Sequence, residues 1–216
     1  MARQAARPFF GRMRNALPIV MLVLLLGSKA QAQSLEIMPG TERVFVDLQW
    51  LGMLSENKRW SVFSRTRATA DYDAATNLFT GAYFNYTTQK GIGLSGLANI
   101  SSSGPAGGGG VHYFKANKQL LVFALAFAER APNSWHYSWF SIVRYRPQLN
   151  DNWRVYTGLE LFTRFTDAGH VVSVQGLRAG LEHKGVQFGL ATNVYGFGAD
   201  YDRVEANPGV FIRKEF

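Results

Sequence analysis

Apolar and polar residues alternate with a period of two along most of the chain after residue 42. In the segment NWRVYTGLELFTRF, one face is mostly apolar and the other carries Arg154, Glu160 and Arg164. This alternation is typical of a β-strand whose two faces meet different surroundings. The 3.6-residue period of an amphipathic helix is missing throughout. We therefore predict an all-β chain with eleven clear strands, at residues 43–54, 59–70, 78–88, 91–101, 109–116, 119–129, 135–146, 152–165, 170–183, 186–198 and 209–216.

Two architectures fit a chain of many alternating strands. A soluble sandwich or barrel turns its apolar faces inward, whereas a transmembrane barrel turns them outward to lipid. Most of the predicted strands have about 10–14 residues, which is longer than globular strands and suits a tilted membrane span. The polar faces are rich in Gly, Ser, Thr and Asn, as in a wet interior. Aromatic residues gather near strand ends on the apolar faces, as in membrane-interface girdles: Trp50, Trp60, Tyr86, Tyr113, Trp135, Tyr145 and Trp153.

The connections between the predicted strands also favour a transmembrane barrel. If the C-terminus is periplasmic, the exterior connections become 39–42, 71–77, 102–108, 130–134, 166–169 and 199–207, and they are longer than the periplasmic ones. That asymmetry is typical of outer-membrane barrels. GPAGGGG, residues 104–110, has no Lys-Ser/Thr after it and is interpreted as a flexible surface loop rather than a phosphate-binding loop.

Closing the barrel requires one more strand than the eleven clear ones. Bacterial single-chain barrels close with an even number of strands, so we predict a twelfth strand in SLEIM, residues 34–38, and keep ten as the alternative. The apolar positions within 170–183 change phase near Gln175 and Gly176, which predicts a β-bulge there. The fold class expected is a transmembrane antiparallel up-and-down β-barrel.

The N-terminus is typical of a secretory signal peptide. A region with four arginines precedes an apolar run from Ala16 to Leu26, and Ala30-Gln31-Ala32 offers a cleavage site. We predict a signal peptide at 1–32 and a barrel domain at 33–216. Residues 33–216 hold 18 Lys and Arg against 15 Asp and Glu, a net charge of +3, so the basicity of the whole chain does not indicate nucleic-acid binding. The chain contains no cysteine, which excludes thiolate metal sites and cysteine nucleophiles.

These features together resemble bacterial outer-membrane β-barrel proteins. The final strand ends on Phe216 after alternating Val210 and Ile212, and this is similar to the C-terminal signal that the barrel-assembly machinery reads. Lys214 departs from that signal, because an apolar residue is usual there. The resemblance implies insertion into the outer membrane of a Gram-negative cell, among its lipids and lipopolysaccharide. The size and the arginine content are similar to those of small twelve-stranded porins for acidic oligosaccharides.

The predicted inward faces carry eight arginines and four carboxylates. An arginine-lined lumen attracts anions and matches carboxylates or phosphates, which predicts a porin-like channel for small anionic or polar solutes. Pairing between these arginines and carboxylates would instead give a closed barrel with a structural or interaction role. The candidate lumen residues are Asp47, Arg65, Arg67, Arg144, Arg146, Arg154, Glu160, Arg164, Arg178, Glu182, Arg213 and Glu215.

An outer-membrane lipid hydrolase is the alternative from another functional class. Such enzymes pair a serine with a histidine, and His136 and Ser138 share one strand face. No carboxylate stands beside them in the sequence, so we expect a protein without enzymatic activity. The histidines show no spacing of metal ligands, and no cofactor is expected.

Overall fold

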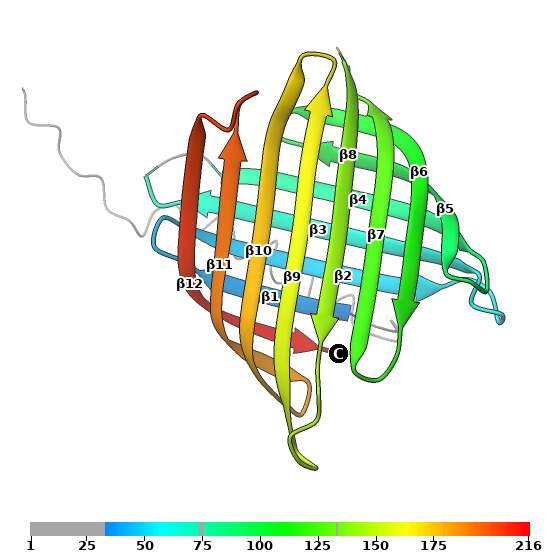
Figure 1. The fold of residues 1–216 in the computed structure, drawn as a ribbon, viewed down its shortest axis with the longest axis vertical. Coiled ribbons are helices and arrows are strands. Elements are labelled where there is room, and N and C mark those ends of the chain that lie inside the picture. The colour runs from blue at the N-terminus through cyan, green and yellow to red at the C-terminus, as the bar shows by residue number, and fades with distance from the viewer. Residues whose placement is uncertain (1–32, 74–75, 133) are drawn as a thin grey trace, which may run out of the picture. The chain divides into compact units, whose positions relative to one another are not determined.

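The computed structural model describes residues 33–73, 76–132 and 134–216, and these form a closed antiparallel barrel of twelve strands (Figure 1). The predicted signal peptide, residues 1–32, lies outside the described residues. Among the described residues, no helix is long and apolar enough to cross a membrane. The strands are β1 (Gln33–Pro39), β2 (Arg43–Met53), β3 (Trp60–Asp71), β4 (Thr76–Thr87), β5 (Ile92–Ser101), β6 (Gly104–Ala116), β7 (Leu120–Arg130), β8 (Trp135–Tyr145), β9 (Trp153–Thr166), β10 (Gly169–His183), β11 (Val186–Phe197) and β12 (Arg203–Glu215).

Each strand pairs with its neighbour in the sequence, and β1 pairs with β12 to close the barrel. The predicted strand in SLEIM is therefore confirmed, as is the choice of twelve strands over ten. The closing ladder is short, because only four residues of β1, from Ser34 to Ile37, pair with β12. The backbone N–H of Phe216 extends it by donating to the carbonyl of Gln33 at 2.9 Å.

Asn207 continues this closure where β1 ends. Its side-chain oxygen accepts hydrogen bonds from the backbone N–H groups of Glu42 (2.9 Å) and Arg43 (3.2 Å), and its side-chain nitrogen donates to the carbonyl of Arg43 (3.1 Å). The side chain is fully buried. Backbone pairing across the seam continues beyond β1 with a bridge between Gly40 and Gly209 and a bond from the Thr41 N–H to the Pro208 carbonyl at 2.9 Å, and the Asn207 amide adds side-chain bonds beside them.

Two ends of the barrel are distinguished below. The C-terminal rim is the end where β12 stops at Glu215, and its connections have two to seven residues. The opposite rim carries connections of two to five residues. The prediction that the exterior connections are the longer ones was wrong, because β6, β10 and β12 extend through residues that the sequence pattern places in loops. The orientation of the two rims in the membrane stays a prediction.

The glycine-rich segment at 104–110 belongs to strand β6 and is not the loop that its composition predicts. A methyl group on Gly108 would collide with the carbonyl oxygen of Ala128 on β7, and one on Gly110 with that of Ala126. Glycine is required here because the two backbones approach each other closely. The run is therefore an adaptation to strand packing.

The break in strand register lies near the start of β10. It falls between His170 and Val172, whereas Gln175 and Gly176 pair regularly with β11. The bulge predicted at Gln175 and Gly176 was therefore wrong. The phase change in the sequence has another cause, since Val172 and Val174 share the face of the inward-pointing Arg178 and make the inner face of β10 partly apolar.

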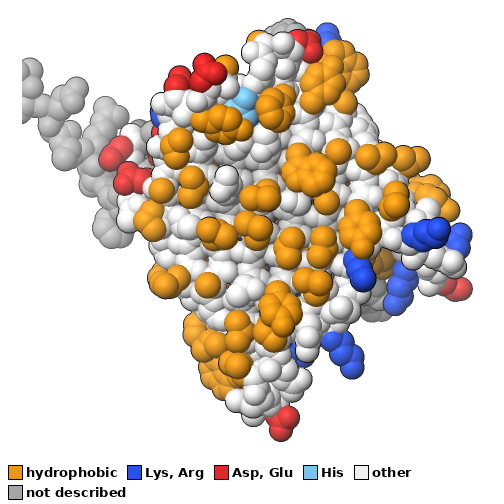
Figure 2. All heavy atoms as spheres, viewed as in Figure 1, with side chains coloured by type: hydrophobic (Ala, Val, Ile, Leu, Met, Phe, Trp, Pro, Cys, Tyr) orange, Lys and Arg blue, Asp and Glu red, His pale blue; other side chains and the backbone are white. Residues whose placement is uncertain are grey.

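The outer wall of the barrel is apolar. Hydrophobic side chains are spread across the face in Figure 2, and the charged side chains lie mostly toward its margins. Exposed residues include Leu94, Ile100 and Leu190, the last with 70% of its surface exposed. On β3 and β4, Trp60 packs against Tyr86 with ring centroids 4.8 Å apart. So much exposed apolar surface is unusual for a soluble monomer and suits contact with lipid.

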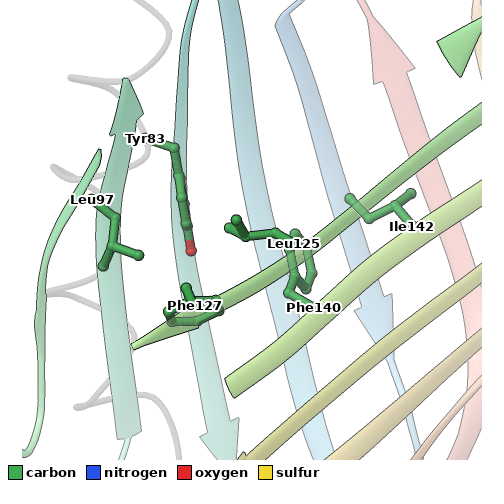
Figure 3. Close-up of a cluster of buried hydrophobic side chains, with 6 residues drawn as sticks. All are labelled: Tyr83, Leu97, Leu125, Phe127, Phe140 and Ile142. Carbon is green, nitrogen blue, oxygen red and sulfur yellow. The ribbon is translucent and has the colours of Figure 1, made fainter. Parts of the chain in front are cut away.

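The interior is only partly polar, which differs from the predicted wet lumen. One apolar cluster joins β4, β5, β7 and β8 (Figure 3) and consists of Tyr83, Leu97, Leu125, Phe127, Phe140 and Ile142. A second cluster consists of Met38, Phe45, Tyr156, Ala191 and Phe211. The strand LLVFALAFAER is apolar on both faces, so one face contacts lipid and the other fills the barrel. The interior is thus packed like the core of a soluble protein on either side of its charged groups.

Replacing Gly110 with Ala should destabilise the barrel, because the added methyl group has no space against the backbone of β7. Overpacking of this kind costs about 1–3 kcal/mol. The matched control is Gly96→Ala, since a methyl group at Gly96 has no neighbour within 4 Å. Urea unfolding followed by the heat-dependent shift in gel migration measures both. Equal stability of the two variants would contradict the close approach.

Replacing Asn207 with Ala should also destabilise the barrel, because two backbone N–H groups lose a buried acceptor. The expected loss is about 1–3 kcal/mol in the free energy of unfolding, the usual cost of unsatisfied buried polar groups. Asn77→Ala, at an exposed position of β4, serves as the control and should change stability little. An unfolding midpoint for Asn207→Ala that matches the control would show that the side chain does not close the seam.

Candidate functional site

A central charge layer crosses the middle of the barrel and consists of Glu36, Asp47, Arg65, Arg67, Glu160 and Arg178. Asp47 on β2 accepts two hydrogen bonds from Arg65 on β3, at 2.7 and 2.9 Å. This bidentate pair is buried, with Asp47 only 2% exposed. Charged groups are rarely buried unless they are paired, so the layer stands as a unit rather than as separate charges.

The layer joins opposite walls of the barrel. Arg65 also donates to Glu160 on β9 at 2.7 Å, and Arg67 donates to the other oxygen of the same carboxylate. In a ring of twelve strands, β3 and β9 are six strands apart in either direction. A direct bond between them means that side chains fill the lumen across its full width at this level.

A second bond of this kind joins β2 and β8, which are also six strands apart. Arg144 donates to the side-chain oxygen of Gln49 at 2.7 Å, and the amide nitrogen of Gln49 donates to Asp47 at 2.5 Å. Among the described residues, Arg144 forms no ion pair with a carboxylate. Its positive charge is therefore held by a neutral acceptor.

Glu36 on β1 neutralises the remaining side of the layer. It accepts a hydrogen bond from Arg178 Nε at 2.8 Å and lies 3.7 Å from Arg213 Nη1 on β12. Arg178 also donates to Asn193 at 3.0 Å, while Arg213 donates to Ser34 at 2.5 Å. These contacts tie β1 to β10 and β12, so the layer also supports the closing seam.

A separate charge cluster lies toward the opposite rim, around Glu129 on β7. Arg164 donates to one oxygen of Glu129 at 2.6 Å, and Asn99 donates to the other at 2.7 Å. His136 Nδ1 lies 3.6 Å from the same carboxylate. Glu129 is almost fully buried, and its partners come from three other strands. This cluster braces β5, β8 and β9 in the same way that the central layer braces β3 and β9.

The predicted lumen residues lie inside the barrel or at the C-terminal rim, and most of them are paired. At that rim, Arg146 lies 2.8 Å from Glu215 and 3.6 Å from Glu182, and Arg154 lies 3.8 Å from Glu182. Whether these residues bind a solute stays a prediction. Their pairing leaves less free positive charge than the sequence suggested.

Two inward carboxylates, Glu36 and Glu129, were missed by the sequence analysis. The alternation in SLEIM places Glu36 opposite Leu35 and Ile37, so that signal was present. Glu129 ends a strand that is apolar on both faces, so its orientation had no signal in the pattern. With these two residues, the eight predicted arginines face six carboxylates. At the opposite rim, Arg43 pairs with Asp71 and Glu205.

Among the described residues, two of the cavities lie inside the barrel at different levels. A small one of about 40 Å³ is enclosed by the central charge layer. A larger one of about 250 Å³, the rim cavity, lies toward the C-terminal rim. Its lining includes Leu51, Met53, Phe63, Phe114, Leu121, Phe123, Ile142, Lys58, Arg144, Arg146, Arg213 and Glu215. The interior therefore has usable space at one end and is nearly filled at its centre.

Solved structures with the same architecture identify the fold. The chain superposes on the NanC porin with a TM-score of 0.54, covering 86% of this chain and 98% of that chain at 12% sequence identity. For the KdgM porin the TM-score is 0.50, over 86% of this chain and 99% of that chain, at 9% identity. The fold is that of a porin-like outer-membrane barrel. No family model matches the chain, and no curated protein matches it in sequence.

The porin-like barrel does not assemble the predicted serine–histidine pair. His136 Nε2 contacts Ser134 Oγ at 3.0 Å, and the hydroxyl of Ser138 has no hydrogen-bond partner among the described residues. No group of three or more His, Asp or Glu within the described ranges could hold a metal ion. His136 and Ser138 are therefore not arranged as a base and a nucleophile.

Another serine–histidine contact lies on the outer face near the opposite rim. His170 Nε2 lies 2.9 Å from Ser173 Oγ, and His170 Nδ1 lies 2.6 Å from the carbonyl oxygen of Gly198. Tyr201 stacks on the imidazole ring with centroids 4.0 Å apart, and Ser173 also bonds Thr163. The serine and the histidine are buried beneath the tyrosine. We interpret this cluster as the anchor of the turn between β11 and β12.

The predicted assembly signal divides into two parts in the porin-like barrel. Val210 and Ile212 on β12 face outward and are each 53% exposed, as predicted. Phe216 lies beyond the end of β12, is largely exposed, and contributes to the mouth of the rim cavity rather than only to the lipid face. Lys214 Nζ donates to the carbonyl of Lys184 at 3.2 Å, which accommodates a charge on the outward face. Recognition by the assembly machinery stays a prediction.

Replacing Arg65 with Met should strongly destabilise the porin-like barrel, because Asp47 would lose its bidentate partner and Glu160 one of its two cations, leaving Arg67 to neutralise both. Breaking a buried ion pair costs about 3–5 kcal/mol. Arg154→Met is the control, because its side chain is partly exposed and its nearest carboxylate oxygen is 3.8 Å away. It should cost no more than about 1 kcal/mol. Urea midpoints that fall in the reverse order would contradict the central role of Arg65.

Proposed function

We propose that the protein is an outer-membrane, porin-like channel that passes small anionic or polar solutes through a lumen constricted at the central charge layer. The apolar outer wall and the twelve-stranded architecture support placement in the outer membrane. The observation that carries the proposal is Arg144, an inward cation with a neutral partner that lines both interior cavities. A cation in this position favours anions at the narrowest part of the lumen.

The electrostatic balance of the interior supports a modest anion preference. The eight predicted arginines exceed their six carboxylate neighbours, and Arg144 is the one of the eight that forms no ion pair with a carboxylate among the described residues. Arginine suits carboxylate or phosphate groups because its planar guanidinium binds them through two hydrogen bonds. A solute would have to exchange contacts with the layer as it passes, so the conductance should be low.

A closed barrel with a structural or interaction role is the second candidate. The bonds from Arg65 and Arg67 to Glu160 favour it, because they span the full width of the lumen. In this case the layer would act as a permanent plug, and the protein would work through its surfaces. The two candidates predict different currents, so one experiment separates them.

Replacing Glu160 with Ala should increase the single-channel conductance several-fold in a planar lipid bilayer. The change removes the group that joins β3 to β9, while Asp47 still pairs with both Arg65 and Arg67. The reversal potential in a salt gradient should shift toward stronger anion preference, because one interior negative charge is lost.

The control is Glu182→Ala, which removes the same charge but lies near the C-terminal rim, beside Arg146 and Arg154. It should change selectivity slightly and leave the conductance close to that of the natural protein. Absence of current in the natural protein and in Glu160→Ala would favour the closed barrel. A reversal potential showing cation preference would refute the proposed selectivity.

A further inference from the structure

The rim cavity is divided into an apolar wall and a cationic wall. The apolar wall comes from neighbouring inward positions: Leu51 lies opposite Phe63 across β2 and β3, and Phe114 lies opposite Phe123 across β6 and β7. The rings of Phe63 and Phe123 face each other with centroids 6.3 Å apart. Inward residues of a water-filled barrel are usually polar, so this surface indicates an apolar occupant.

The cationic wall begins directly beside the apolar one. Arg144 is the cross-strand neighbour of Leu121, so its guanidinium adjoins the apolar surface. Arg146 and Arg213 also line the cavity, and Lys58 lies at its mouth. Glu215 is the one carboxylate in the lining among the described residues, and it pairs with Arg146 at 2.8 Å. The cavity therefore favours an anionic group at this wall.

The polar groups on the third side are already satisfied by each other. Ser95 donates to the side-chain oxygen of Asn85 at 2.7 Å and contacts His112 Nδ1 at 2.8 Å, while Thr87 contacts His112 Nε2 at 2.9 Å. These groups offer a ligand few free donors. A site for a hydroxyl-rich solute such as a sugar would need many. The remaining specificity comes from apolar contact and positive charge.

We propose that the rim cavity binds a single-chain anionic amphiphile, with its carboxylate or phosphate at Arg144 and Arg213 and its alkyl chain along Phe63, Phe123 and Leu121. The volume of about 250 Å³ suits a short alkyl chain and is near the lower end of ligand-binding cavities. The anionic head accounts for the cation without a carboxylate partner, and the chain accounts for the inward apolar wall. This site lies at the C-terminal end of the solute path proposed above and shares Arg144 with it, but binding of the amphiphile does not depend on conduction.

The test measures binding of decanoate to the barrel of residues 33–216 in nanodiscs of a zwitterionic lipid, by calorimetry, with empty nanodiscs as the baseline. Decanoate should bind saturably at one molecule per barrel. Butyrate, which has the head group without the chain, should bind at least tenfold more weakly. Decyltrimethylammonium, which has the chain with the opposite charge, should show no saturable binding. Decyl phosphate should bind too, and the tighter of the two anions identifies the head group as a fatty acid or a phosphate ester.

Two variants locate the bound molecule. Met53→Trp fills the cavity and should weaken decanoate binding at least tenfold, whereas Leu54→Trp, at an exposed neighbouring position outside the lining, should leave it unchanged. Arg144→Met should also weaken binding at least tenfold, and it leaves no carboxylate unpaired, since its partner is Gln49.

Non-saturable decanoate binding, equal binding of the cationic amphiphile, or equal behaviour of the Met53 and Leu54 variants would each overturn the inference. Failure here is separable from failure of the proposed channel. Current without decanoate binding contradicts only the amphiphile site, and decanoate binding without current contradicts only the channel.

Discussion

The pair of bonds that Glu160 accepts from Arg65 and Arg67 is the constraint on which the rest of the interior depends. These bonds join strands on opposite sides of the ring. The distance between the two walls at this level is therefore the length of one arginine and one glutamate side chain placed end to end. The apolar clusters then pack inside the same barrel beside this layer. The same bonds determine where free space remains, because the layer that they hold together fills the middle of the lumen and leaves the rim cavity to one side of it.

The interior combines two ways of filling a barrel. Charged residues occupy the centre, where partners from several strands supply most of their hydrogen bonds. Apolar residues occupy positions where neighbouring strands supply complementary shapes, as Tyr83 and Phe127 do within their cluster. Neither arrangement alone accounts for the cation at Arg144, which lies at the boundary between them. At that boundary a solute or ligand can contact a cation and an apolar surface at the same time.

The sequence predicted the fold well, since alternation, strand length and interface aromatics all indicated a transmembrane barrel. It also predicted the inward direction of Arg65, Glu160 and Arg178, because each lies on a strand with one clearly apolar face. It failed where both faces are apolar, as around Glu129, and where glycine composition hid the first part of β6, because the strand was predicted to start at residue 109 and it starts at Gly104. Pairing across the barrel could not be predicted, because it depends on strand positions far apart in the sequence.

The short closing ladder makes the seam between β1 and β12 a weakly paired part of the barrel wall. The contact of β1 with β12 has four paired positions, whereas β9 and β10 share fourteen, and Asn207 completes the seam through side-chain bonds. Parting the wall at this seam therefore breaks fewer backbone hydrogen bonds than parting it anywhere along β9 and β10. Since the outer face is apolar, a sideways passage from the lumen to the surrounding lipid would break fewer backbone pairs at this seam than between β9 and β10.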